Sequence, residues 1–312
     1  MALVSVVIPT IRRPKLVLRA LSSVFRQTYQ KLEAIVVVDG PDEETIAALG
    51  SIDDPRLRVI VNPRSLTAAG ARNVGADHAI GEWLAFLDDD DEWLPGKIET
   101  QLAFASRRDA ILVSCLSRVV TPTASFTRPL VAYDNSVPLD EYLFDRRSLF
   151  GSTNFIQTSS YLMPRSLFDK VRFNVNSPHD DWDFILRLSK QLGVRIEMAP
   201  EILVILYSEE QRPSLSTNGS WRDSLVWIDG IRSLVTRRAY SGFCLCVVGS
   251  RAAKARTYSA FFLLIYRAFR FGSPRISHIL PFIGYWLSPE PLLRRLRDRK
   301  SFSIAPASSR IP

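Results

Sequence analysis

Residues 83–95 read WLAFLDDDDEWLP, a short apolar run followed by five consecutive acids. The apolar part, Trp83–Leu87, is typical of a buried strand. Asp88–Glu92 follow at its carboxyl end, and Trp93-Leu94-Pro95 close the stretch. In open sheets with parallel strands, ligands bind beyond the carboxyl ends of the strands. The stretch therefore predicts a sheet with an acidic ligand site at this edge.

Strand-like and helix-like segments alternate on the amino-terminal side of this stretch. The β-branched run Ile35–Val38 is typical of a parallel strand covered on both faces. Further strands are expected at Leu3–Ile8 and Leu57–Val61, and helices at Lys15–Arg26, Glu43–Leu49, Thr67–Asp77 and Pro95–Ser106. This alternation predicts an α/β fold with a mainly parallel central sheet. Polar pairs, Pro9-Thr10 and Asp39-Gly40, follow two of the strands, as the acids follow Trp83–Leu87.

The pattern is less regular after residue 110. The segments predict strands at Ile111–Val120 and Ser159–Met163, loops at 121–140 and 207–220, and helices at Asp180–Gln191, Asp223–Ala239 and Ala252–Phe271. Residues 1–250 hold 28 Lys and Arg against 30 Asp and Glu, whereas residues 251–312 hold 12 against 2. The net charge of +8 therefore comes from the last fifth of the chain. We expect a domain at 1–220, with halves at about 1–105 and 106–220, and a helical basic appendage at 221–312.

Composition narrows the class of protein. Hydrophobic residues make up 46% and charged residues 23%, which is typical of a folded globular chain and excludes a disordered one. Cys115, Cys244 and Cys246 have no metal-ligand spacing, so we expect buried thiols in a reducing compartment. We expect no signal peptide, because no basic stretch precedes the apolar run Leu3–Ile8 and no small-residue cleavage site follows it; no run reaches the roughly 18 apolar residues of a membrane span.

Five adjacent carboxylates repel one another, and a bound cation would remove that cost. Mg²⁺ and Mn²⁺ prefer carboxylate oxygens and often bridge to a phosphate of the substrate. In an extended segment alternate side chains share a face, so Asp88 and Asp90 are expected to converge on one ion while Asp89 points elsewhere. The alternative interpretation is a solvated acidic loop. The apolar segments on both sides of the acids favour the cation site.

Five motifs occur in order along the chain: Val6–Thr10, Ser23–Tyr29, Val36–Gly40, Ala69–Gly75 and Phe86–Pro95. Together they resemble the family 2 glycosyltransferases, densely over residues 3–105 and loosely to Arg187. The resemblance implies a GT-A fold, which is Rossmann-like, and a nucleotide-sugar donor. It also implies a divalent cation, Mg²⁺ or Mn²⁺, as the cofactor.

The resemblance assigns residues to the donor site. Thr10 matches the position whose backbone approaches the nucleotide, and Arg13 falls near a basic position used for phosphate. Asp39 matches the acid that accepts a hydrogen bond from the base, usually uracil. Arg72 matches an arginine near the base and the phosphates, and Asp89 a nucleotide-sugar acid. Asp90, with Asp88, matches the metal-binding acids, Asp90 being the direct ligand.

The segment Asp180–Arg187 resembles the acidic motif on the acceptor side, which makes Asp181 the expected general base. A carboxylate near the acceptor hydroxyl can take its proton; the alternative is that these acids only favour the positive end of a helix. The chain departs from the family pattern in three places: Val38 replaces an acid, Val171–Phe173 replaces a glycine-rich segment, and His179 precedes the acids.

The resemblance implies transfer of a sugar, in one inverting displacement, from a UDP-linked donor to a glycan or lipid-linked acceptor in polysaccharide biosynthesis. Two alternatives remain: a nucleotide-sugar-binding protein without catalysis, and a sugar-phosphate nucleotidyltransferase. Nucleotidyltransferases typically have a glycine-rich loop after the first strand, whereas Pro9–Pro14 has no glycine. A dinucleotide oxidoreductase is excluded because no G-x-G-x-x-G follows a strand.

The basic appendage places aromatic and aliphatic residues beside arginines, as in Tyr258–Ala268 and Ile279–Leu287. This composition suits a helix in the membrane interface and equally a core helix with a solvated basic face. No nucleic-acid-binding motif accompanies the charge, so nucleic acid is not an expected partner. We expect a cytoplasmic protein, with contact at the inner face of the cell membrane if the first interpretation holds.

Overall fold

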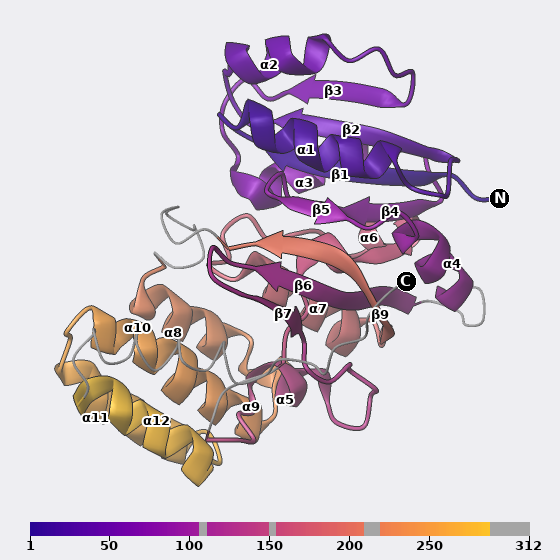
Figure 1. The fold of residues 1–312 in the computed structure, drawn as a ribbon. Helices are drawn as coiled ribbons and strands as arrows, with labels where there is room; N and C mark the ends of the chain where they lie inside the picture. The colour runs from indigo at the N-terminus through magenta and orange to yellow at the C-terminus, as the bar shows by residue number, and fades with distance from the viewer. Residues whose placement is uncertain (106–110, 150–153, 209–218, 288–312) are drawn as a thin grey trace. The chain divides into compact units, whose positions relative to one another are not determined.

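The computed structural model describes residues 1–105, 111–149, 154–208 and 219–287 (Figure 1). Two compact units divide the chain. The first lies within Met1–Arg118, Pro129–Leu139 and Asn154–Tyr207, and the second within Val119–Arg128, Asp140–Thr153 and Ser208–Pro312. The units interleave along the sequence, and the expected boundary between residues 220 and 221 stays a prediction.

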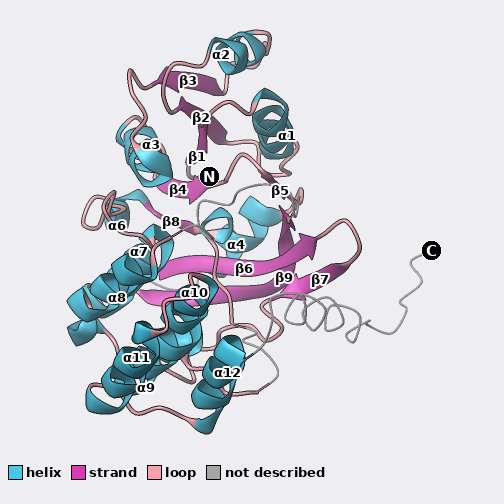
Figure 2. Cartoon of the chain, turned by 90° about the vertical axis from the view of Figure 1, so that its left-hand side faces the viewer, coloured by secondary structure: helices cyan, strands magenta, loops and turns pink. Residues whose placement is uncertain are grey.

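The first third of the chain alternates strands and helices as the sequence predicts. Its elements are β1 (Val4–Thr10), α1 (Pro14–Phe25), β2 (Leu32–Val38), α2 (Glu43–Gly50), β3 (Leu57–Val61), α3 (Thr67–Asp77), β4 (Trp83–Phe86), β5 (Asp91–Trp93) and α4 (Lys97–Ala105). Strands β3, β2, β1 and β4 lie side by side, and each neighbouring pair is parallel. The run Ile35–Val38 is fully buried, since helices cover both faces of the sheet. Figure 2 shows α1 on one side of these strands and α3 on the other.

Helix α3 packs closely on the sheet because its inner face is made of small residues. Ala69, Gly70, Ala71, Gly75 and Ala76 are all buried. A Cβ atom added at Gly75 would lie 2.3 Å from Val7 Cγ1 and 3.1 Å from Val37 Cγ2. Both valines are fully buried in β1 and β2, so neither can move aside freely.

We expect Gly75→Ala to lower the free energy of unfolding by about 2 kcal/mol, the typical cost of overpacking a core. Gly50→Ala is the matched control, since Gly50 also lies in the last turn of a helix and nothing lies within 4 Å of an added Cβ there. That control is expected to be neutral or stabilising. Urea unfolding of both variants measures the difference, and equal effects would contradict the packing argument.

The second half of the first unit adds antiparallel strands to this sheet. Its further elements are β6 (Ile111–Val120), β8 (Leu162–Pro164), α6 (Arg165–Phe168), α7 (Asp180–Gln191) and β9 (Arg195–Tyr207). The strand order is β3-β2-β1-β4-β8-β6-β9-β5, with β8 antiparallel to β4 and β5 antiparallel to β9. The strand expected at Ser159–Met163 is wrong in part, because Thr158–Ser160 form a 3₁₀ turn before β8. The mainly parallel α/β fold is confirmed.

The second unit contains β7 (Ser125–Arg128), most of α5 (Leu139–Phe144) and the later helices. Those helices are α8 (Trp221–Gly230), α9 (Arg237–Gly242), a π-helix (Phe243–Val248), α10 (Gly249–Lys254), α11 (Ser259–Arg270) and α12 (Ile276–Leu287). Strand β7 and the beginning of α5 correct the loop expected at 121–140. The helices expected at Asp223–Ala239 and Ala252–Phe271 are each interrupted, at Ile231–Thr236 and at Ala255–Tyr258.

A helical appendage at the carboxyl end is confirmed.

None of the helices in the described part of the chain combines the length and the apolar character that a bilayer crossing requires. Cys115 and Cys244 are buried free thiols as expected, whereas Cys246 is half-buried. The loop expected at 207–220 lies mostly outside the described residues.

Candidate active site

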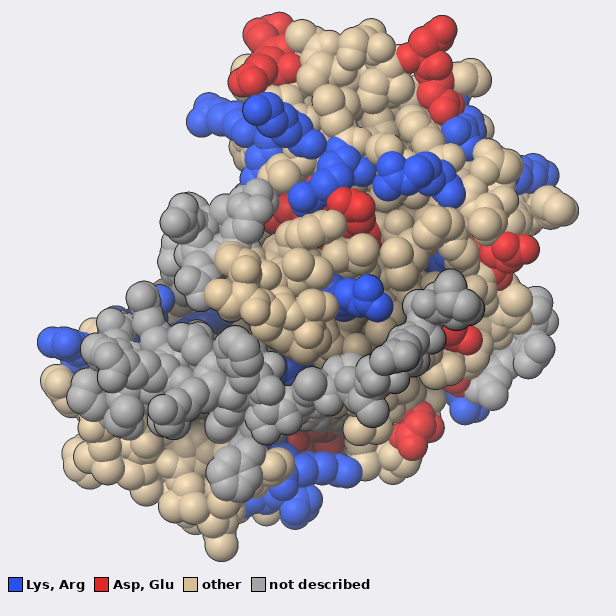
Figure 3. Space-filling view, in the orientation of Figure 1, with Lys and Arg blue, Asp and Glu red and all other residues tan. Residues whose placement is uncertain are grey.

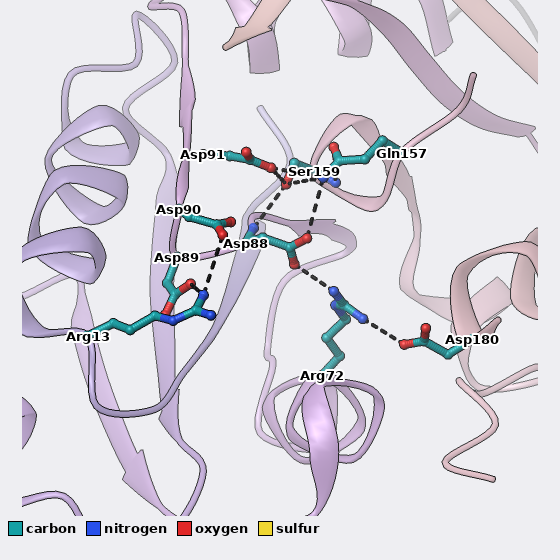
Figure 4. A network of polar contacts seen from close by, with 9 residues as sticks. All are labelled: Arg13, Arg72, Asp88, Asp89, Asp90, Asp91, Gln157, Ser159 and Asp180. Atoms are coloured by element: carbon teal, nitrogen blue, oxygen red, sulfur yellow. Dashed lines mark hydrogen bonds and ion pairs between the residues drawn. The ribbon is translucent and has the colours of Figure 1, made fainter. Parts of the chain in front are cut away.

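Asp88–Asp91 form a turn that connects β4 to β5. The Asp91 N–H donates to the Asp88 carbonyl at 3.1 Å, so the segment is not extended. The expectation that Asp88 and Asp90 share a face by strand alternation is therefore wrong in its geometry. In the turn, Arg13 contacts both Asp89 and Asp90, and Gln157 contacts both Asp88 and Asp91 (Figure 4). These shared donors offset part of the repulsion among the four carboxylates.

Arg72 joins the acidic turn to the head of α7. Its Nη2 donates to Asp88 Oδ1 at 2.6 Å and its Nη1 to Asp180 Oδ2 at 2.9 Å, as Figure 4 shows. The guanidinium is buried and lies over the ring of Phe173, with 5.2 Å between Cζ and the ring centroid. Burial lowers the pKa of Arg72, but the carboxylates of Asp88 and Asp180 more than offset it, so the pKa is raised. Three motifs far apart in sequence thus meet at one side chain.

Arg13 and Thr10 hold the second acid of the turn. Arg13 Nη1 donates to Asp89 Oδ1 at 3.0 Å and to Asp90 Oδ2 at 3.4 Å, and Thr10 Oγ1 donates to Asp89 Oδ2 at 2.8 Å. Burial raises the pKa of Asp89 to about 6, although Arg13 and Thr10 both lower it. Thr10 and Arg13 therefore meet the acidic turn through their side chains, as part of one site.

The fourth acid is held by residues that the sequence did not single out. Ser159 Oγ donates to Asp91 Oδ2 at 2.6 Å, and Gln157 Nε2 donates to the same oxygen at 2.9 Å. Ser159 Oγ also accepts the Asp88 N–H at 3.0 Å, and the Trp93 indole donates to the Ser159 carbonyl at 2.8 Å. Burial, with the charges of Asp88 and Asp90, raises the pKa of Asp91. The 3₁₀ turn therefore fixes both ends of the acidic turn.

Asp39 lies at the end of β2 and binds the loop before α3. Its carboxylate accepts hydrogen bonds from Asn62 Nδ2 at 2.9 Å, Ser65 Oγ at 2.8 Å and the Leu66 N–H at 2.9 Å. The residue is 4% exposed. Three donors on one loop make Asp39 an organiser of this loop.

Asp181 lies beside Asp180 in the first turn of α7. Its Oδ1 accepts the Trp182 N–H at 2.8 Å. Desolvation raises the pKa of Asp181 to about 7, and the neighbouring charge of Asp180 adds to this effect. Asp183, in contrast, is buried and accepts from Arg187 Nε at 2.7 Å, an interaction within the helix. The pKa of Asp181 is thus raised by its burial into the range of neutral pH.

The acidic turn fits a divalent cation. Asp88 and Asp90 side chains are 25% and 33% exposed, whereas Asp89 is 6% exposed and Asp91 is buried. Among the described residues, no group of three or more His, Cys, Asp or Glu is placed to hold a metal ion. Mg²⁺ commonly takes only one or two protein carboxylates and completes its shell with water and substrate phosphate. Two accessible carboxylates match that pattern.

Basic side chains border the acids on the side of α1. Arg19 Nε lies 3.1 Å from Glu92 Oε1, and its Nη2 donates to the Asp90 carbonyl at 2.6 Å. Its guanidinium also stacks on Tyr207, 4.0 Å from the ring centroid. Figure 3 shows Lys and Arg atoms around a small acidic group over α1 and β5. These cations make the surroundings of the acidic turn suitable for a phosphorylated ligand.

The fold and this site together define a glycosyltransferase of the GT-A type. A mannosyltransferase from Pyrobaculum calidifontis, PcManGT, solved in complex with GDP-Man and Mn²⁺, superimposes with a TM-score of 0.60 and 16% identity. The alignment covers 96% of this chain and 84% of that chain.

The model of the family "Glycosyl transferase family 2" matches residues 5–172, and the chain belongs to this family. The amylovoran biosynthesis glycosyltransferase AmsB of Erwinia amylovora is 29% identical over 245 residues, which are 75% of this chain and 79% of AmsB. A GalNAc(5)-diNAcBac-PP-undecaprenol beta-1,3-glucosyltransferase of Campylobacter jejuni is 34% identical over 219 residues, 69% of this chain and 68% of that enzyme. The chain is therefore an enzyme that transfers a sugar.

Proposed function

We propose that the chain is an inverting, cation-dependent glycosyltransferase that moves a sugar from a UDP-linked donor to a hydroxyl group of a lipid-linked acceptor. The observation that carries this proposal is the bridge from Asp88 through Arg72 to Asp180, because it places the acidic turn beside the helix head that holds Asp181. A lipid-linked acceptor is supported by the Campylobacter jejuni relative, whose substrate is an undecaprenol-linked glycan. The sugar transfer would then take place at the inner face of the cell membrane.

In this proposal Asp88 and Asp90 hold the cation, and Asp90 is its direct ligand. A bound Mg²⁺ or Mn²⁺ would supply positive charge to the leaving diphosphate. Arg72 adds a second cation beside Asp88, and Arg13, whose Nη1 lies 3.4 Å from Asp90 Oδ2, would contact a phosphate oxygen. Asp39 and Thr10 would bind the nucleoside, with Asp39 also fixing the loop around it. Asp89 supports this side by holding Thr10 and Arg13 together.

Asp181 is the proposed general base. An acceptor hydroxyl group must lose its proton as it attacks the anomeric carbon, and a carboxylate within hydrogen-bond reach can take it. A pKa of about 7 leaves much of Asp181 ionised at neutral pH while keeping it basic enough to accept a proton. Attack from the side opposite to the leaving diphosphate gives inversion.

Thermal unfolding with nucleotides tests the donor. We expect UDP with Mn²⁺ to raise Tm by about 3 °C or more, because a ligand that binds only the folded state stabilises it. GDP with Mn²⁺ and UDP with EDTA are the controls, and neither should reproduce the shift. A shift with GDP alone would make the donor GDP-linked, and an equal shift in EDTA would remove the cation from the proposal. Asp90→Asn should abolish the Mn²⁺-dependent part of the shift.

A further inference from the structure

Helix α11 exposes four aromatic side chains along one face. They are Tyr258 at the residue before the helix, Phe262, Tyr266 and Phe269, which we call the aromatic row. Their exposed fractions are 69%, 76%, 60% and 57%. At 100° per residue the four positions fall within an arc of about 80°, so they form one continuous stripe.

The opposite face of α11 is its buried face, whereas the aromatic row stays exposed although Tyr258 and Phe262 touch neighbouring rings: 5.9 Å separates the ring centroids of Tyr258 and Trp286, and 5.2 Å those of Phe262 and Phe261. Ala260, Leu264 and Ala268 are buried. Phe261 stacks on Phe282 of α12, with 5.0 Å between the ring centroids, and meets Trp286 edge to face. Exposed aromatic residues gathered in one stripe carry a hydration cost that a monomer rarely keeps without a binding role. The exposed stripe therefore predicts that this face of α11 binds a partner surface.

The charges around the aromatic row identify the kind of partner. Residues 251–287 contain six Lys or Arg and no Asp or Glu. Exposed Lys254 and Arg256 lie just before Tyr258, at one end of the row. At the other end Arg232 and Arg270 flank Phe271, with 4.7 Å and 5.5 Å between their Cζ atoms and the ring centroid. Aromatic side chains between basic groups match the interface of an anionic bilayer, where rings lie at headgroup depth and cations meet phosphates.

We propose that the aromatic row of α11 is a docking face for an anionic lipid bilayer, with Lys254, Arg256 and Arg270 contacting the headgroups. Docking would hold this face of the second unit at the membrane surface. It deepens the proposed function, because a lipid-linked acceptor lies in that bilayer. The binding itself needs neither donor nor acceptor, so it can be tested separately from transfer.

Cosedimentation of the full chain with vesicles tests the proposal. Vesicles of phosphatidylcholine with phosphatidylglycerol should bind the protein, and high salt or phosphatidylcholine alone should weaken binding strongly. Phe262→Ser with Phe269→Ser should reduce the partition coefficient about tenfold or more. Lys254→Gln, Arg256→Gln and Arg270→Gln should each reduce it about fivefold. Val226→Ser, which changes an apolar residue of α8 that is 71% exposed, is the matched control and should leave binding unchanged.

Unchanged vesicle binding by the aromatic double variant would overturn the proposal. So would a wild-type dimer, seen by light scattering, that the double variant dissociates, because the row would then contact a second copy. Tm measurements show that each variant is folded. The UDP-dependent shift in Tm is recorded on the same samples, so loss of membrane binding and failure of the donor assignment are separate results.

Discussion

Asp181→Asn is expected to reduce the rate of sugar transfer about 10³-fold, within the usual range for removal of a general base. Asparagine keeps the size of the side chain and can accept the Trp182 N–H, but it cannot accept the acceptor's proton. Donor binding should stay nearly unchanged, because Arg72 is paired with Asp180 and Asp88 rather than with Asp181. Transfer assays and the UDP–Mn²⁺ shift in Tm measure the two properties separately.

The pH dependence gives this prediction a second readout. Because a protonated carboxyl group cannot act as a base, kcat/KM of the wild type should fall tenfold per pH unit below about 7, the pKa of Asp181. The residual activity of Asp181→Asn should lack that dependence. Asp223→Asn is the matched control, since Asp223 also lies in the first turn of a helix but is exposed in the second unit.

The free energy of unfolding should change with pH in the opposite sense to kcat/KM. The pKa of Asp181 is raised from 3.8 to about 7 by folding, so between these values the folded state keeps a proton that the unfolded chain has released. The free energy of unfolding that depends on this group therefore falls as pH rises toward 7. Asparagine removes that loss, and Asp181→Asn should raise Tm at pH 8. A lower Tm together with equal losses of transfer and donor binding would assign Asp181 a structural role.

The strands and helices of the first third could be predicted because local sequence dominates there. β-Branched runs alternate with amphipathic segments, and β3 and α3 have the predicted bounds. Strand β9 was missed because Arg195–Tyr207 contains Glu197, Pro200 and Glu201, which obscure a strand pattern. The break between α10 and α11 contains no glycine or proline. Arg256 adopts a positive φ of 51° there, and an arginine in the sequence does not predict such a backbone conformation.

The candidate site was predictable in composition and less so in geometry. Asp39 and Asp88–Asp91 follow the ends of β2 and β4, Arg72 lies within α3, and the structure brings Arg72 against Asp88. Their pairing depends on tertiary contacts, such as the one between Arg72 and Asp180 across 108 positions. Ser159 and Gln157 gave no local signal, since serine and glutamine occur in every kind of loop. Their role is visible only once β8 lies against β4.

Arg72→Met is expected to cause the other large effect. The substitution removes a buried cation and leaves Asp88 and Asp180 facing each other without it, which should lower the free energy of unfolding by about 3 kcal/mol. Transfer should be lost as well, since the leaving diphosphate loses a stabilising charge. Urea unfolding and transfer assays measure these two losses.

A double variant separates the structural part of this effect from the catalytic part. Arg72→Met with Asp180→Asn removes the cation and one of the two carboxylates that it neutralises, so part of the stability should return. Activity should not return, because no residue replaces the guanidinium beside Asp88 on the donor side. Recovery of both properties would mean that Arg72 acts only as a counter-ion for the acids. Recovery of stability alone would mean that Arg72 stabilises the charge that develops on the leaving group. The double variant restores the charge balance among the buried acids in part, but it still has no cation at position 72 for the diphosphate.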